Sequence, residues 1–139
     1  MSQVASDVWL KRDARGIDWT YVKEMYRISS FDNGRSAKLL RRCFEQSQTV
    51  CFAMIGSQLV GTARAISDRC SCAAIFDVCV HPDYRSQGIG RAMVRSLLAD
   101  LTGQYVLLTT SIPEFYAPLG FRREANAMWG LPQRGLGHE

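Results

Sequence analysis

A glycine-containing loop in the middle of the chain has the composition of an anion-binding site. Gly88 and Gly90 stand one residue apart between a strand-like segment and a helical pattern, with Arg85 and Arg91 on either side. The first backbone amides of a helix have no intrahelical acceptor, and the helix dipole adds partial positive charge there. Glycine lets a ligand approach the backbone closely, and arginine forms charge-assisted hydrogen bonds with phosphate oxygens. The loop is therefore expected to hold a phosphate or a diphosphate.

Two well-known phosphate-binding motifs fit this loop poorly. The dinucleotide fingerprint requires GxGxxG, but Met93 occupies the position of the third glycine. The P-loop requires Gly-Lys followed by Ser or Thr, which this segment lacks. A tight turn that binds nothing stays open as an alternative, because glycine also occupies turns for steric reasons alone.

Asp77 precedes the loop within an otherwise apolar segment. Burial of a carboxylate without a partner is costly and raises its affinity for a proton, so Asp77 is a candidate general base. Two alternatives stay open: an ion pair with a nearby arginine such as Arg64, or an edge position in solvent. His81 follows the same segment and is expected to have a structural role, as most isolated histidines do.

Apolar periodicity predicts the elements that must position these residues. Helical spacing predicts three long helices, over residues 19–28, 37–44 and 88–101. Alternating or continuous apolar runs predict strands over residues 4–10, 49–55, 59–66, 73–80, 105–110 and 121–129. A short helix is expected between Pro113 and Gly120. This order predicts an α/β (α+β) layer fold with a mixed, mostly antiparallel central sheet flanked by helices.

Length and composition favour one soluble globular domain. The chain has 139 residues, of which 47% are hydrophobic and 22% charged, so we expect a single domain over residues 1–139 with residues 131–139 as a loose tail. No apolar run approaches the roughly 20 residues of a membrane helix, and no membrane partner is expected. Five cysteines without a CxxC motif predict no metal site and no complete disulfide framework. They favour a reducing, cytoplasmic environment.

The net charge of +4 comes mostly from arginine, which suits a phosphorylated ligand or an acidic partner. The basic residues are scattered rather than clustered in a run. We therefore expect no nucleic-acid partner.

Two segments resemble the GNAT N-acetyltransferase superfamily. Residues 80–90, Val-His-Pro-Asp-Tyr-Arg-Ser-Gln-Gly-Ile-Gly, are similar to its acetyl-CoA signature, Q/R-x-x-G-x-G/A. Residues 115–121, Phe-Tyr-Ala-Pro-Leu-Gly-Phe, are similar to its FYxxLGF segment. The two motifs stand in the order that the family has, and the resemblance extends from about residue 49 to about residue 128. Residues 108–114 depart from the family pattern, because they carry hydroxyl groups where many members have an asparagine.

The resemblance implies an acetyl-CoA-dependent N-acetyltransferase, an acyltransferase in which a primary amine attacks the thioester directly in a ternary complex. The cofactor-binding residues that it implies are Val78, Cys79, Val80, Arg85, Ser86, Gln87, Gly88, Ile89, Gly90 and Arg91. Amides of residues 87–91 would hold the diphosphate of CoA, and the pantetheine would pair with the strand at residues 78–80. The amide of Val78 would face the thioester carbonyl.

The resemblance also implies catalytic and acceptor residues. Tyr116 would act as the general acid towards the leaving thiolate, and Asp77 or a chain of water molecules as the base. Phe31, Asp32 and Trp129 would bind the acceptor, which suggests a small-molecule amine on an apolar or aromatic body. Core packing of the aromatic residues stays open. The alternative function is a non-catalytic acyl-CoA-binding sensor or regulatory module, and the protein is expected to be a monomer or homodimer.

Overall fold

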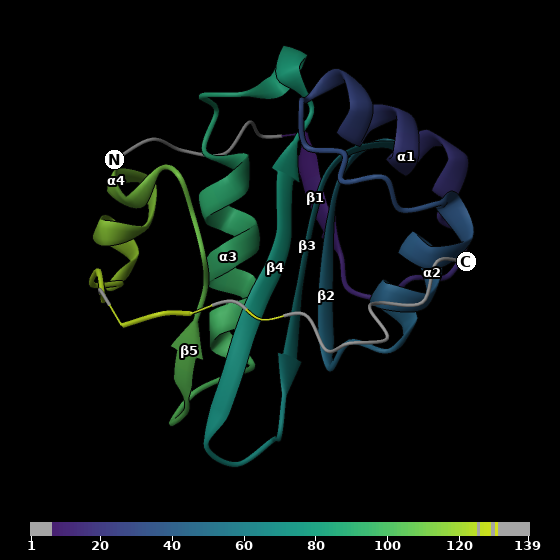
Figure 1. Ribbon diagram of the computed structural model, residues 1–139. Coiled ribbons are helices and arrows are strands. Elements are labelled where there is room, and N and C mark those ends of the chain that lie inside the picture. The colour runs from purple at the N-terminus through teal and green to yellow at the C-terminus, as the bar shows by residue number, and fades with distance from the viewer. Residues whose placement is uncertain (1–6, 125, 129, 131–139) are drawn as a thin grey trace. The chain divides into compact units, whose positions relative to one another are not determined.

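The computed structural model of the chain describes residues 7–124, 126–128 and 130 (Figure 1). Contacts between residues divide the chain after Leu108 into two compact units. The first unit holds the sheet and the three long helices, and the second begins at Thr109. None of the helices in the described ranges has the length and apolar character that crossing a membrane requires.

The sheet of the first unit has five strands in the order β1-β2-β3-β4-β5. The strands are β1 (Val8–Lys11), β2 (Thr49–Ile55), β3 (Gln58–Ser67), β4 (Cys72–Val80) and β5 (Tyr105–Leu107). The first four pair antiparallel with their neighbours, whereas β5 is parallel to β4. Antiparallel neighbours need only short connections, and Gly56 and Ser57 suffice to join β2 to β3. The predicted mixed, mostly antiparallel sheet is confirmed.

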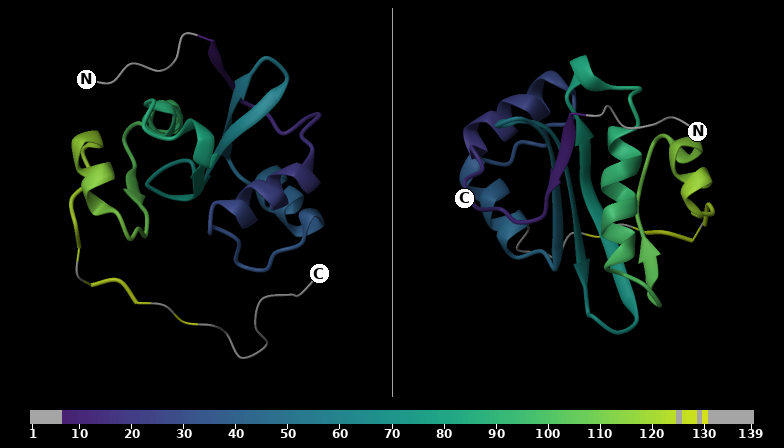
Figure 2. Two further views of the ribbon diagram at one scale, coloured as in Figure 1. Left: turned by 90° about the horizontal axis from the view of Figure 1, so that it is seen from above. Right: turned by 180° about the vertical axis from the view of Figure 1, so that it is seen from behind.

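Helices cover both faces of this sheet (Figures 1 and 2). Helices α1 (Trp19–Ile28) and α2 (Ala37–Glu45) lie on one face, and α3 (Ile89–Ala99) lies on the other. Side chains cap the first two helices, because Asp18 accepts a hydrogen bond from the amide of Tyr21 and Ser36 accepts one from the amide of Leu39. The apolar side chains of α1 and α2 form a core with those of β2.

Gly61 allows α3 to pack closely on the other face. A Cβ atom at this position of β3 would lie 2.9 Å from Cε of Met93 and 3.2 Å from the carbonyl oxygen of Cys79. Met93 is fully buried on α3, and the loop after β4 leads into the first turn of this helix. The missing side chain therefore fixes the depth at which α3, and with it the end of that loop, sits on the sheet.

The second unit contains a short helix, α4 (Pro113–Tyr116), which continues as a 3-10 turn over Ala117–Leu119. Gly120, at φ 96°, ends this turn in the left-handed conformation. The predicted strand over residues 121–129 is wrong, because residues 121–124 and 126–128 form no strand and the other two lie outside the described residues. This segment alternates poorly, since three charged residues follow Phe121 in succession.

Candidate active site

The loop between β4 and α3 presents the start of a helix that no side chain caps. Gly88 is the N-cap residue of α3 at φ 80°, and in the described residues no side-chain hydrogen bond caps this end of the helix. The first intrahelical bond runs from the amide of Ala92 to the carbonyl of Gly88, over 3.0 Å. Ser86 also has a positive φ, of 64°. The backbone therefore turns twice through the left-handed region just before α3, and the amides of the first turn precede the helical bonding pattern.

Arg85 ties this loop to the end of β4, and His81 stabilises the turn within the loop. The Nε atom of Arg85 donates to the carbonyl of Val80 over 3.3 Å. The Nδ1 atom of His81 accepts a bond from the amide of Asp83 over 3.1 Å, and its ring contacts that of Tyr84. His81 thus caps the 3-10 turn (Pro82–Tyr84), as expected for a structural histidine.

One edge of β4 is open along most of its length. Strand β5 pairs only with residues Cys72 to Ala74, so within the described part of the chain no strand pairs with residues 75–80 on that side. Cys79 lies in the open stretch, but its side chain is buried, and burial raises the pKa of its thiol to about 11. The thiol is neutral at pH 7, so this edge offers backbone groups rather than a nucleophile.

A β-bulge interrupts the ladder between β3 and β4. Thr62 pairs with Cys79 and Arg64 with Phe76, so two residues of β4 stand opposite one residue of β3. One of the two is Asp77, at φ 57°. The hydroxyl of Thr62 donates to the carbonyl of Asp77 over 2.8 Å, and the hydroxyl of Tyr26 lies 2.8 Å from that of Thr62. A non-glycine residue in the left-handed region is strained, and such residues cluster at functional sites.

The side chain of Asp77 is held by two arginines. Arg35 bonds both carboxylate oxygens, over 2.6 and 2.9 Å, and Nε of Arg64 bonds one of them over 2.6 Å. Burial raises the pKa of this carboxyl group, but the hydrogen bonds and charges of the two arginines outweigh burial, and the net pKa lies below the usual value. The expectation of a raised proton affinity is therefore wrong, because it assumed a carboxylate without a partner. The ion pair with Arg64 is one of the alternatives that the sequence leaves open, whereas no sequence signal indicates the contact with Arg35.

The predicted acceptor residues Phe31 and Asp32 lie in the loop between α1 and α2. Phe31 is partly exposed, and its ring centroid is 5.0 Å from that of Tyr26. Asp32 forms an ion pair with Lys23 over 2.9 Å, and the hydrogen bond from Lys23 lowers the pKa of Asp32. Trp129, the third predicted acceptor residue, lies outside the described residues.

Tyr116, the predicted general acid, is described within the second unit. Its side chain is buried, and its ring contacts those of Phe115 and Phe121, at centroid distances of 4.8 and 5.8 Å. Burial raises the pKa of the phenol, so Tyr116 is protonated at neutral pH. A neutral phenol can donate a proton or a hydrogen bond, and the catalytic role of Tyr116 stays a prediction.

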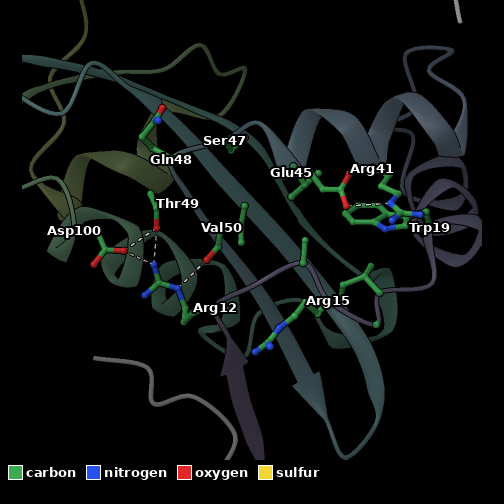
Figure 3. A pocket seen from close by; sticks show the side chains of 14 residues that line it. Arg12, Arg15, Trp19, Arg41, Glu45, Ser47, Gln48, Thr49, Val50 and Asp100 are labelled. Atoms are coloured by element: carbon green, nitrogen blue, oxygen red, sulfur yellow. Dashed lines mark hydrogen bonds and ion pairs between the residues drawn. The ribbon is translucent and has the colours of Figure 1, made fainter.

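A separate pocket of about 1030 Å³ lies at the start of β2 and the C-terminal end of α3 (Figure 3). Polar groups of its lining bond one another: Arg12 donates to the hydroxyl of Thr49 and to the backbone carbonyl of Val50, and Arg41 pairs with Glu45. The pocket reaches Asp100, whereas Gly88 lies at the other end of α3, roughly 18 Å away at 1.5 Å per residue. This pocket is distinct from the loop between β4 and α3, residues 81–88, which we call the glycine loop. No cluster of three or more metal-ligating side chains occurs in the described ranges.

Comparison with known proteins identifies the family. The model of the acetyltransferase (GNAT) domain matches residues 46–123, which include β2 to β4, the glycine loop and α4. The chain belongs to the GNAT acetyltransferase family. The resemblance seen in the two sequence motifs is thereby confirmed. The match begins after α2, so the acceptor residues predicted in the loop between α1 and α2 lie outside it.

Relatives and solved structures agree with this assignment. Serotonin N-acetyltransferase 2, chloroplastic, of Oryza sativa subsp. japonica is 31% identical over 131 residues, which cover 88% of this chain and 65% of that protein. A Deinococcus radiodurans structure assigned as an acetyltransferase covers 99% of both chains at 26% identity, with a TM-score of 0.80. An aminoglycoside N-acetyltransferase in complex with CoA shares the fold at 12% identity, over 91% of this chain and 95% of that one, with a TM-score of 0.70. The chain spans about a third to two thirds of the length of the curated relatives that it matches.

Proposed function

We propose that the protein is an acetyl-CoA-dependent N-acetyltransferase that acetylates the primary amine of a small molecule with an aromatic body. The observation that carries the proposal is the uncapped start of α3, where Gly88 stands in the left-handed conformation after the exposed residues Arg85 and Ser86. An uncapped helix start with a glycine in this conformation binds phosphate groups well, because amides and dipole act together. CoA supplies a diphosphate for this loop and a thioester for the reaction.

The residues of the loop fit a diphosphate. In the proposal the amides of residues 87–91 donate to its oxygens, and the side chains of Arg85 and Ser86, both exposed, lie beside it. The open edge of β4 supports the next part of the binding mode. An extended pantetheine arm pairs with Val78, Cys79 and Val80 in the way that an added strand would.

The bulge of β4 supports a binding position for the thioester carbonyl. A bulge leaves its extra residue outside the regular ladder, so an amide at this point is available to a ligand. In the proposal the amide of Val78 donates to the carbonyl oxygen and stabilises the negative charge that develops on it. Val78 is half-buried, which limits competition from water.

Proton transfer follows from the charges at the site. The ion pairs of Asp77 make its carboxylate a weak base, so we assign removal of the amine proton to water rather than to Asp77. Tyr116 is the general acid of the proposal, because a buried phenol stays protonated until the thiolate leaves.

An arylalkylamine is the acceptor class that the proposal favours. The rice relative is a serotonin N-acetyltransferase by name, and Phe31 gives the loop between α1 and α2 an exposed aromatic ring. Asp32, the next residue in this loop, adds a carboxylate that is paired with Lys23, and Trp129 remains a predicted part of the same site. The five cysteines are all free, which supports a reducing compartment such as the cytoplasm.

Two measurements test the proposal. Calorimetry measures the binding of CoA, and a thiol-release assay measures the turnover of acetyl-CoA with serotonin, tryptamine and an aliphatic diamine. We expect saturable binding of CoA and thiol release that depends on an arylalkylamine. Tight binding without thiol release from any amine would instead support the acyl-CoA sensor, and the absence of binding would exclude both functions.

A further inference from the structure

A buried cluster of charges joins the bulge of β4 to the loop between α1 and α2. Its centre is the carboxylate of Asp77, whose side chain is only 8% exposed. Arg35 and Arg64, at 14% and 10% exposure, approach this carboxylate from two different elements. Arg35 makes the two-pronged contact that the guanidinium geometry favours, and such contacts fix orientation as well as distance.

The cluster stabilises a backbone conformation that is otherwise unfavourable. Asp77 has a φ of 57°, which a residue with a side chain adopts only where its surroundings enforce it. The side chain is held by the two arginines, and the carbonyl of the same residue accepts a bond from the buried hydroxyl of Thr62. Hydrogen bonds therefore hold both the side chain and the backbone carbonyl of Asp77, and the shape of the bulge depends on these bonds.

Arg35 belongs to a loop that is bonded internally as well. Its Nε donates to the side chain of Asn33 over 2.7 Å, and the amide of Gly34 donates to Asp32 over 3.0 Å. The guanidinium also lies 5.9 Å from the ring centroid of Tyr26 on α1. Movement of Arg35 would thus carry with it the segment that contains Phe31 and Asp32.

A role as proton acceptor does not suit Asp77, because its carboxylate receives three short hydrogen bonds from permanently charged groups. The cluster holds two positive charges against one negative charge, and the neighbouring Asp32 is paired with Lys23. What the geometry provides is a rigid link between two backbone segments that are 42 residues apart in the sequence.

We propose that Arg35 and Asp77 are positioning residues: their ion pair holds the loop between α1 and α2 against the bulge of β4, and so sets where the acceptor amine lies relative to the thioester. The inference rests on the proposed function, in which the loop contacts the acceptor and the bulge holds the thioester carbonyl. It assigns a role to Arg35, which neither sequence motif includes.

Hydrogen exchange of the free protein tests the link without any cofactor. We expect Arg35→Met to speed amide exchange at residues 29–36 and 76–78 by at least tenfold. Arg27→Met is the matched control, because Arg27 pairs with the carboxylate of Glu24 on α1 but has a side chain that is 64% exposed. This change should leave the exchange rates at residues 29–36 and 76–78 unaltered. Unchanged protection in Arg35→Met would overturn the inference. If Arg35→Met does not fold, Arg35→Lys takes its place, because lysine keeps the charge but loses the two-pronged contact. The increase in amide exchange is then expected to be smaller.

Steady-state kinetics with serotonin and acetyl-CoA test the catalytic consequence. Arg35→Met and Asp77→Asn should each raise the KM for serotonin about tenfold, while the affinity for CoA changes less than twofold. The KM of the double variant should be no higher than that of the more impaired single variant, because both changes break the same link. The pH profile of kcat/KM should keep its shape in Asp77→Asn, and Asp77→Glu should recover part of the loss.

The outcomes separate this inference from the proposed function. Loss of kcat at constant KM in Asp77→Asn, with loss of the alkaline rise in rate, would make Asp77 the general base and overturn a positioning role. A wild-type chain that binds no CoA and acetylates no amine would overturn the proposed function together with the kinetic half of the inference. The exchange experiment would still decide whether Arg35 holds the loop.

Discussion

Replacement of Gly88 by alanine separates binding at the helix start from general loss of stability. Gly88 has a φ of 80°, and an alanine in this left-handed conformation costs about 1–2 kcal/mol. Gly103 is a matched control, because its φ is 83°, a Cβ atom there meets no atom within 4 Å, and it follows the other end of α3. Gly103→Ala should therefore carry the same backbone cost without reaching the glycine loop.

Both variants should lower the melting temperature by a similar amount. For a chain of this length a loss of 1–2 kcal/mol corresponds to roughly 3–10 °C. Only Gly88→Ala should weaken the binding of CoA, because its methyl group stands where the diphosphate must approach the backbone. We expect the Kd to rise at least tenfold, which corresponds to about 1.4 kcal/mol.

Calorimetric titration with CoA and a thermal melt of each variant provide the two readouts. The affinity of Gly103→Ala should stay within twofold of the wild-type value. Equal Kd values for the two variants, at equal losses of melting temperature, would refute the placement of the diphosphate at the start of α3.

Three further predictions concern other parts of the chain. Tyr116→Phe should lower kcat about 100-fold and leave the Kd for CoA unchanged, and an unchanged kcat would show that another group protonates the thiolate. The pKa of Asp77 is lowered in the folded state, so its ion pairs stabilise the protein above the unfolded pKa, near 4, and this contribution disappears as the pH falls below that value. Asp77→Asn should thus lower the free energy of unfolding, measured with urea at pH 7, by about 3–5 kcal/mol. The difference in this free energy between the variant and the wild type should shrink below pH 4. A difference that does not change with pH would contradict the ion pairs. Gly61→Val should lower the free energy of unfolding by about 1–3 kcal/mol. The double variant with Met93→Ala should lose less than the sum of the two single losses. Additive losses would argue against the close contact between β3 and α3.

Local pattern was sufficient to predict the elements that carry their own signals. The helix over residues 19–28 and the strand over residues 49–55 form with the predicted bounds. The helix begins after a capping aspartate, and the strand is an apolar run that ends at a glycine turn. The predicted strand over residues 121–129 failed in the described residues because a strand also needs a partner, which the local sequence does not supply.

One part of the candidate site could also be predicted from local sequence, whereas another part could not. The glycine loop was predictable, because its residues are contiguous and the helix that follows has a clear period. The state of Asp77 was not, because its proton affinity depends on Arg35, which is 42 residues away and shares no pattern with it. A bulge that gives Asp77 a positive φ also leaves no mark in an apolar run of β4.

Amide chemical shifts on titration with CoA show whether backbone amides of residues 87–91 bind its diphosphate. We expect the amide signals of Gly88 and Gly90 to move and to saturate with the cofactor, while those of Gly56 and Gly103, in turns that belong to other connections, stay in place. Signals at residues 87–91 that do not respond at a saturating concentration of CoA would contradict this binding.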